Sequence, residues 1–135
     1  YQERSHQEVR DKLYEWGLHN TVVEETIVQL ITSDFLNEER FAKLYAGGKF
    51  RIKNWGRIKI KLALKQKKVS DYCIRKGLEE IGEREYGIVL RKVLADKSRL
   101  LKEKNPLKHK YKLSSYAISR GFESELVWEE LKTSP

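Results

Sequence analysis

Apolar residues along the chain recur mainly at spacings of three and four, which is the period of one face of an α-helix. Alternation of apolar and polar residues, the pattern of a half-buried strand, is short and rare. Only two prolines occur, Pro106 and the terminal Pro135, and Leu, Lys, Glu, Arg and Ala dominate. These residues favour helices. The pattern therefore predicts an all-α chain of about eight helices.

The apolar pattern also repeats at a longer period. Three sets of six positions show the same successive gaps of 4, 5, 4, 1 and 4 residues, and the sets begin 51 and 53 residues apart. The sets are Val9, Leu13, Leu18, Val22, Val23 and Ile27; Ile60, Leu64, Val69, Cys73, Ile74 and Leu78; and Leu113, Ala117, Phe122, Leu126, Val127 and Leu131. Such a period is typical of tandem helical units that pack mainly on their neighbours.

Each copy has the pattern of a helix, a short turn and a second helix. Gly17 and Gly121 stand at the end of the first helix in their copies, where a left-handed glycine ends a helix at little cost. Lys68 takes that place in the middle copy, which predicts a weaker stop. The predicted N-caps of the second helices are Asn20, Ser70 and Ser124.

Connecting helices are predicted between the copies, around Glu38–Gly48 and around Glu83–Lys104. The chain then divides into repeat 1 at residues 1–33, repeat 2 at 34–82 and repeat 3 at 83–135. We expect tandem three-helix, helix-turn-helix-like repeats in one elongated, curved array. Repeat 1 lacks a leading helix, and the chain starts at Tyr1 and contains no Met, so we expect a fragment truncated at its N-terminus.

The charge is unevenly distributed. Twenty-eight Lys and Arg against 20 Asp and Glu give a formal net charge of +8, which predicts an anionic partner. Residues 40–68 contain 11 basic and no acidic residues, and residues 97–112 contain seven basic and one acidic, at matching places in the repeat. On a helix starting near Arg57, the side chains of Arg57, Lys61, Lys65 and Lys68 fall within about 80°. The predicted contact residues are Lys49, Arg51, Lys53, Arg57, Lys59, Lys61, Lys65, Lys67, Lys68, Lys108, Lys110 and Lys112.

Aromatic residues occur within the first basic block. Rings beside Lys and Arg suit single-stranded nucleic acid, because bases stack on the rings while the cations contact phosphates. Phe41 and Tyr45 have helical spacing and are predicted to be core. Phe50 and Trp55 flank an expected turn, marked as flexible by Gly47, Gly48, Asn54 and Gly56, and are predicted to be more open.

Catalytic and metal-binding patterns are missing from the sequence. His6, His19 and His109 show no metal-ligand spacing, and no phosphate-binding glycine loop occurs. Cys73 is the only cysteine, so no internal disulfide forms, and we expect it to be buried. No apolar run approaches the length of a membrane span. We expect a cytoplasmic binding protein that is not an enzyme and needs no cofactor or metal.

Several motifs match, in order and spacing, those of one family. The acidic-x-Arg-Phe-Ala signature of that family has a similar counterpart here in Glu38-Glu39-Arg40-Phe41-Ala42. Its opening helix is similar to the segment from Arg4 to Leu13. A central Gly, Arg-Ile, Leu-x-x-Lys-Gly-Ile segment resembles residues 56–70, and an Arg-Gly-aromatic turn resembles residues 119–122. Over nearly its whole length the chain resembles the RecX family. Lys68 replaces the usual Gly of that family, and Lys59 and Ala63 stand where it often has Arg and Glu.

The resemblance implies a regulator of the RecA recombinase in DNA repair and the SOS response. It implies a monomer that binds RecA and RecA filaments on single-stranded DNA, within the filament groove, with weak binding to duplex DNA at most. The implied outcome is inhibition of the ATPase, recombinase and co-protease activities of RecA. Two other functions stay open: a stand-alone helix-turn-helix DNA-binding protein, and an adaptor for another acidic protein. The second helices of the copies are acidic or mixed, which disfavours the former.

Overall fold

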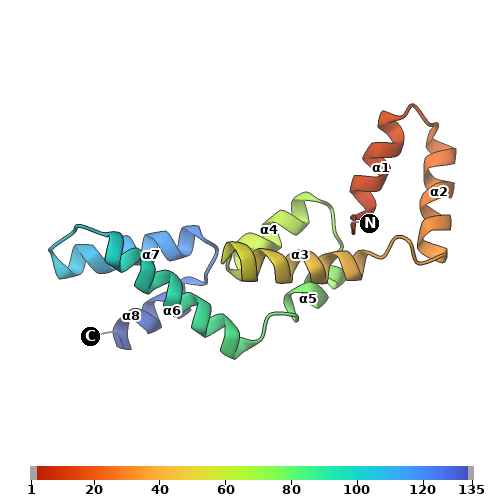
Figure 1. Ribbon diagram of the computed structural model, residues 1–135. Helices are drawn as coiled ribbons and strands as arrows, with labels where there is room; N and C mark the ends of the chain where they lie inside the picture. The colour runs from red at the N-terminus through yellow and green to blue at the C-terminus, as the bar shows by residue number, and fades with distance from the viewer. Residues whose placement is uncertain (1–2, 134–135) are drawn as a thin grey trace. The chain divides into compact units, whose positions relative to one another are not determined.

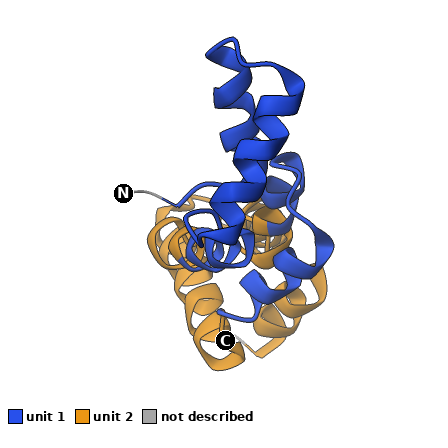
Figure 2. Cartoon of the chain, turned by 90° about the vertical axis from the view of Figure 1, so that its right-hand side faces the viewer, with its two compact units in different colours: residues 1–47, 61–80 blue, residues 48–60, 81–135 orange. Residues whose placement is uncertain are grey.

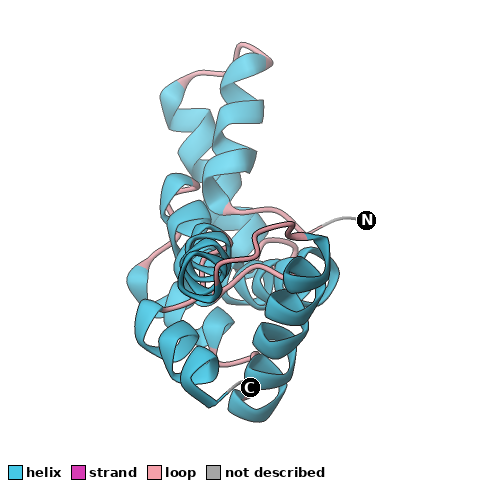
Figure 3. Cartoon of the chain, turned by 90° about the vertical axis from the view of Figure 1, so that its left-hand side faces the viewer, coloured by secondary structure: helices cyan, strands magenta, loops and turns pink. Residues whose placement is uncertain are grey.

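The computed structural model describes residues 3–133, and that part of the chain contains eight α-helices and no strand (Figure 1). The all-α prediction is therefore confirmed. The helices are α1 (His6–Glu15), α2 (Asn20–Thr32), α3 (Glu38–Lys53), α4 (Arg57–Gln66), α5 (Asp71–Leu78), α6 (Glu83–Leu100), α7 (Pro106–Ser119) and α8 (Ser124–Thr133). Short loops join them, as the view coloured by secondary structure shows (Figure 3).

Two helix ends differ from the prediction. Helix α3 continues to Lys53, so Gly47 and Gly48 lie inside a helix and do not mark a flexible turn. Phe50, near the end of α3, is fully buried. The free energy of burying its ring stabilises the last turns of α3, because it outweighs the ~1 kcal/mol by which a glycine disfavours a helix. Helix α6 ends earlier than predicted, at Leu100. The loop after it leads to Asn105, whose side chain caps α7 by accepting from two backbone N–H groups.

The turn after the first helix has the same backbone form in all three copies. Gly17, Lys68 and Gly121 have φ of 81°, 60° and 100°. In each copy the next residue donates its N–H to the carbonyl five residues before it: Leu18 to Leu13 at 3.3 Å, Val69 to Leu64 at 3.1 Å, and Phe122 to Ala117 at 3.2 Å. This is the hydrogen bond of a Schellman motif. The stop at Lys68 thus has the same form as at the two glycines, and the expectation that it is weaker stays a prediction. Since α4 ends at Gln66, Lys68 does not belong to the basic arc of that helix.

The N-cap predictions are correct in one copy of three. Ser70 caps α5, with its Oγ accepting from the N–H of Cys73 at 3.2 Å. Asn20 and Ser124 are instead the first residues of α2 and α8. The equivalent of Ser70 before α2 is His19, which makes no side-chain cap bond. The two wrong predictions are thus displaced by one residue toward the C-terminus.

The chain forms two compact units, and α3 and α4 contribute to both (Figure 2). The first runs up to Gly47 and includes Lys61–Glu80; the second comprises Gly48–Ile60 and the chain from Ile81 onward. One core cluster of the first unit contains Leu13, Val23, Ile27 and Leu36. In the second, the ring of Tyr86 lies 5.7 Å from that of Phe50 and 5.2 Å from that of Phe122, between centroids. The division into three repeats stays a prediction.

Burial follows the repeat at some positions and departs from it at others. The fifth position is buried in every copy, at Val23, Ile74 and Val127. The fourth is not: Val22 is exposed, and Cys73 and Leu126 are half-buried. It precedes the buried residue by one place and therefore points about 100° away around the helix. Cys73 is thus a half-buried free thiol, and the expectation that it is buried is wrong.

One carboxylate ties together three helices of the first unit. Glu38, at the start of α3, accepts from the backbone N–H of His6 at 3.0 Å and from that of Ser70 at 3.2 Å. His6 is the first residue of α1, and Ser70 is the cap of α5. A negative side chain is favourable at helix N-termini, where N–H groups are unpaired. Glu38 therefore fixes the ends of α1 and α5 relative to α3.

Candidate nucleic-acid interface

The turn between α3 and α4 places an aromatic ring close to two lysines. Asn54, at φ 57°, ends α3, and Trp55 follows as a partly exposed side chain. The ammonium of Lys49 lies 4.9 Å from the centroid of the Trp55 ring, and that of Lys59 lies 4.6 Å from it. An ammonium within about 6 Å of an indole centroid is attracted to the negative face of the ring. The three residues form one basic and aromatic cluster in the second unit, which we call the Trp55 cluster.

Backbone contacts hold this turn against the turn between α7 and α8. The N–H of Gly56 donates to the carbonyl of Arg120 at 2.8 Å, and that of Ile58 donates to the carbonyl of Gly121 at 3.0 Å. The Arg120 guanidinium donates to the carbonyl of Lys53. The chains pass so closely that a Cβ on Gly56 would lie 2.3 Å from the Gly121 carbonyl carbon. These hydrogen bonds and the close contact between the two glycines therefore fix the backbone of the turn that carries Trp55.

Arg57, a predicted contact residue, is bound within the second unit. Its Nε lies 2.8 Å from the Glu123 carboxylate and its Nη1 lies 2.7 Å from that of Glu83. The guanidinium stacks over the ring of Tyr86 at 3.9 Å, and only 21% of the side chain is exposed. Burial acts to lower the pKa of Arg57, but the hydrogen bond to Glu83 and the charge of Glu123 outweigh it and raise that pKa. Two carboxylates thus compensate the charge of Arg57.

Tyr86 completes this network from α6. Its hydroxyl donates to Glu123 and accepts from the backbone N–H of Arg57 at 3.0 Å. Burial, and next the hydrogen bond to Glu123, raise the pKa of Tyr86 far above its usual range, against the lowering effect of Arg57. Sequence reasoning missed Glu83, Tyr86 and Glu123, because no local pattern shows that residues so far apart meet. The only residue of this network that the sequence pattern had marked is Arg57, which directly follows Gly56.

The other predicted contact residues of the second unit differ in their surroundings. The Arg51 Nε lies 3.4 Å from a carboxylate oxygen of Glu85, and the Lys112 ammonium lies 2.9 Å from Glu103. The hydrogen bond from Lys112 lowers the pKa of Glu103. Lys53 and Lys108 are exposed. Arg51 is therefore partly compensated by an acid from outside its basic block, and Lys112 by the one acid within its own block.

Four predicted contact residues belong to the first unit. Lys61, Lys65 and Lys68 are exposed, and none of them forms an ion pair with a residue in the described range 3–133. The Lys67 ammonium lies 3.6 Å from the Glu8 carboxylate and 5.7 Å from the centroid of the Tyr45 ring. Burial raises the pKa of the Tyr45 hydroxyl. Lys61, Lys65 and Lys68 thus present uncompensated positive charge, whereas the charge of Lys67 is compensated by Glu8.

The four aromatic residues of the basic block take three different environments. Phe41 is buried, as predicted, whereas Tyr45, also predicted to be core, is only half-buried; their ring centroids are 5.7 Å apart. Phe50 is fully buried, so the expectation that it is open is wrong. The reason is that α3 does not end before it, and the helix turns its ring onto Tyr86. Trp55 remains the one open ring predicted from the turn.

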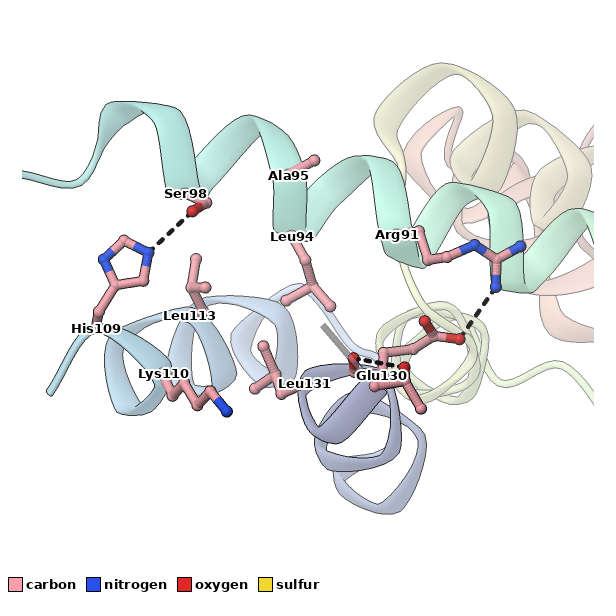
Figure 4. Close-up of a pocket in the computed structure, with 10 residues that line it drawn as sticks. Arg91, Leu94, Ala95, Ser98, His109, Lys110, Leu113, Glu130 and Leu131 are labelled. Carbon is pink, nitrogen blue, oxygen red and sulfur yellow. Dashed lines mark hydrogen bonds and ion pairs between the residues drawn. The ribbon is translucent and has the colours of Figure 1, made fainter. Parts of the chain in front are cut away.

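A cavity of about 470 Å³ lies among α6, α7 and α8 in the second unit, and Lys110 lines it (Figure 4). The apolar part of its wall is formed by Leu94, Leu113 and Leu131. At its edge the Arg91 Nη1 lies 3.1 Å from a carboxylate oxygen of Glu130. The Ser98 Oγ lies 2.9 Å from the His109 Nε2. Within residues 3–133 no carboxylate contacts His109, so the pair lacks the acid that orients the histidine of a serine nucleophile.

Metal-binding clusters and membrane-spanning helices are both absent from the part of the chain that the structure describes. No group of three or more His, Cys, Asp or Glu side chains is placed to hold a metal ion. No helix in that part is both long and apolar enough to cross a membrane.

Comparison with known proteins gives consistent results. Residues 37–78 match the family model of the second three-helix domain of RecX. The regulatory protein RecX of Clostridium acetobutylicum is 33% identical over 133 residues, which are 96% of this chain and 61% of the relative. That of Clostridium perfringens is 32% identical over 121 residues, or 88% of this chain and 56% of the relative. The chain thus spans about 60% of the length of these relatives.

Solved structures share the fold. The crystal structure of RecX from Lactobacillus salivarius superimposes with a TM-score of 0.90 over 98% of this chain and 86% of that chain, at 21% identity. A second crystal structure, of a regulatory protein RecX, gives a TM-score of 0.89 over 99% of this chain and 66% of that chain, at 20% identity. The two relatives from Clostridium are both named regulatory protein RecX. Family model, relatives and fold agree that the chain belongs to the RecX family.

Proposed function

We propose that the protein binds RecA and RecA filaments on single-stranded DNA in the cytoplasm, and that it inhibits the ATPase, recombinase and co-protease activities of RecA. Membership of a family of regulatory proteins supports a binding function. The observation that carries the proposal is the stretch of residues 40–68, with 11 basic and no acidic residues. A filament that contains DNA offers phosphate groups to such a segment, and cations attract them strongly.

The exposed lysines of α4 are the residues that we assign to this contact. Lys61 and Lys65 project from one helix at a spacing of four, which places them on the same face. Neither is compensated by an acid in the described chain, in contrast to Arg57 and Lys67. Lys68 adds a third charge just beyond the helix end. Binding through a surface of this kind weakens with salt, since phosphate contacts release counterions.

The test is DNA-dependent ATP hydrolysis by the cognate RecA, with the full-length protein titrated in. We expect inhibition by the wild type, and weaker inhibition by Lys61→Glu and Lys65→Glu. Lys132→Glu makes the same charge change at an exposed position near the C-terminus and should inhibit like the wild type. Absence of inhibition by the wild type would contradict the proposal. Equal inhibition by all variants would move the contact away from α4.

A further inference from the structure

We propose that the Trp55 cluster is a binding site for single-stranded DNA, in which one nucleobase stacks on the Trp55 ring and the flanking phosphates bind Lys49 and Lys59. The inference rests on the proposed function, because it names the part of the chain that touches the DNA strand of the filament. Aromatic side chains next to cations are the usual means of holding a single strand, since every base has a stacking face.

The surroundings of Trp55 favour this ring over the other aromatic residues of the basic block. Phe41 and Phe50 are buried and offer no face to a base. Tyr45 also has a lysine over its ring, but that lysine is paired with the Glu8 carboxylate. A carboxylate at that place repels phosphate. Among these four rings, Trp55 alone combines partial exposure with two ammonium groups.

Two positive charges lie at the cluster. The ammonium groups of Lys49 and Lys59 are 4.9 Å and 4.6 Å from the centroid of the Trp55 ring. A strand whose base stacks on this ring brings its flanking phosphates within reach of both ammonium groups, and opposite charges attract. Since each ammonium ends a flexible stem, an arriving base displaces it from the ring toward the adjacent phosphate.

The turn that carries Trp55 is fixed before any ligand binds. Its backbone is hydrogen-bonded to Arg120 and Gly121, and two glycine backbones are in close contact there. A rigid platform loses little conformational entropy when a base stacks on it, so more of the stacking energy appears as affinity. The site needs no contact with base edges, and we therefore expect little dependence on DNA sequence.

The test measures binding of the full-length protein to a fluorescently labelled oligothymidylate of roughly 20 nucleotides, without RecA. Trp55→Ala is expected to weaken binding roughly tenfold, and Trp55→Phe, which keeps a ring, by less than about threefold. Trp16→Ala is the matched control, because Trp16 is an exposed tryptophan of the first unit and should leave the affinity unchanged. Thermal unfolding of each variant, followed by circular dichroism, shows whether the fold is kept.

Two further readouts separate stacking from a merely structural role. The chain has three tryptophans, and stacking on Trp55 quenches its fluorescence, so oligothymidylate should quench the wild type but leave Trp55→Phe nearly unquenched although it still binds. Trp55→Ala should keep the salt dependence of the wild type, because the phosphate contacts remain. Lys59→Ala should reduce the slope of log affinity against log salt by about 0.7.

The outcomes separate this inference from the proposed function. If the wild type inhibits RecA but Trp55→Ala binds the oligonucleotide as well as the wild type does, the stacking site is refuted and the RecA function stands. If Trp55-dependent binding and quenching occur without any inhibition of RecA, the stacking site stands and the RecA function falls. Equal quenching of the wild type and Trp55→Phe would also refute the site, whatever the affinities.

Discussion

The backbone of Gly56 lies directly against the backbone of Gly121, so that a Cβ on Gly56 would stand 2.3 Å from both the carbonyl carbon and the carbonyl oxygen of Gly121. The contact joins the turn before α4 to the turn after α7. It explains why the two turns need glycine for different reasons. Gly121 also has φ 100°, whereas Gly56 is required only by the lack of space.

Gly56→Ala is expected to destabilise the protein by about 3 kcal/mol, because the added methyl group meets backbone atoms that cannot move aside easily. Gly48→Ala is the matched control. Gly48 lies inside α3, and a methyl group added there would meet no neighbouring atom within 4 Å, so alanine should stabilise by about 0.5–1 kcal/mol. Urea unfolding of the two variants measures both effects. Equal stabilities would contradict the close contact at Gly56.

Lys68→Gly is expected to stabilise the protein by up to about 1 kcal/mol. Lys68 has φ 60°, which costs a residue with a Cβ roughly 1–2 kcal/mol, and the greater chain entropy of glycine offsets part of the gain. Lys65→Gly removes the same charge but lies inside α4, where glycine costs about 1 kcal/mol. Opposite shifts in the urea midpoint are therefore predicted for the two variants. A loss of stability in Lys68→Gly would show that the lysine side chain contributes more than its backbone conformation costs.

Tyr86→Phe should lower the free energy of unfolding by about 2 kcal/mol at neutral pH, because the Glu123 carboxylate and the Arg57 N–H lose their partner. The folded pKa of Tyr86 is raised, so the fold favours the protonated hydroxyl. This contribution is complete below the unfolded pKa of about 10 and is lost as the pH rises from there through the folded pKa.

The difference in stability between the wild type and Tyr86→Phe should therefore narrow above about pH 10. Urea unfolding at a series of pH values from neutral to alkaline measures it. The exposed Tyr72→Phe is the control and should follow the wild type throughout. If the difference in stability stayed constant up to the highest pH, folding would not raise the pKa of the Tyr86 hydroxyl, and the prediction would be wrong.

Local patterns in the sequence were sufficient to predict the helical class and the pairs of helices joined by short turns. The gaps between apolar residues located every helix–turn–helix, because one face of each helix must be buried. They did not locate the end of α3, since glycine propensity was outweighed by the burial of Phe50. They did place Lys68 at the position of Gly17 and Gly121, and in the structure it adopts the same left-handed conformation, whose cost the hydrogen bonds of the turn and the burial of Val69 offset.

The candidate site was predictable only in its composition. The count of charges marked residues 40–68, yet charge along a sequence does not show which cations meet acids from distant helices. Arg57 meets Glu123, which lies 66 residues away, and Lys67 meets Glu8. Lys49 and Lys59 meet over Trp55 because α3 and α4 are joined by a tight turn. Tertiary contacts therefore divided one basic block into internal ion pairs and exposed charges.

This division predicts that substitutions of Arg57 and of Lys59, which are two residues apart, have different effects on stability and on DNA binding. A double-mutant cycle with Arg57→Gln and Glu123→Gln should give a coupling energy of about 1–2 kcal/mol, since the pair is half-buried and hydrogen-bonded. The same cycle with Lys59→Gln and Glu123→Gln should give less than about 0.5 kcal/mol, because the Lys59 ammonium lies over the Trp55 ring instead.

The cycle also separates stability from DNA binding. The double variant Arg57→Gln with Glu123→Gln leaves the net charge unchanged, so its affinity for oligothymidylate should stay within about twofold of the wild type. Lys59→Gln should keep the stability but weaken binding, as it removes an ammonium from the Trp55 ring. If the double variant instead bound more weakly than Lys59→Gln at equal stability, Arg57 would be a DNA contact, and the ion pairs to Glu83 and Glu123 would have to open for binding.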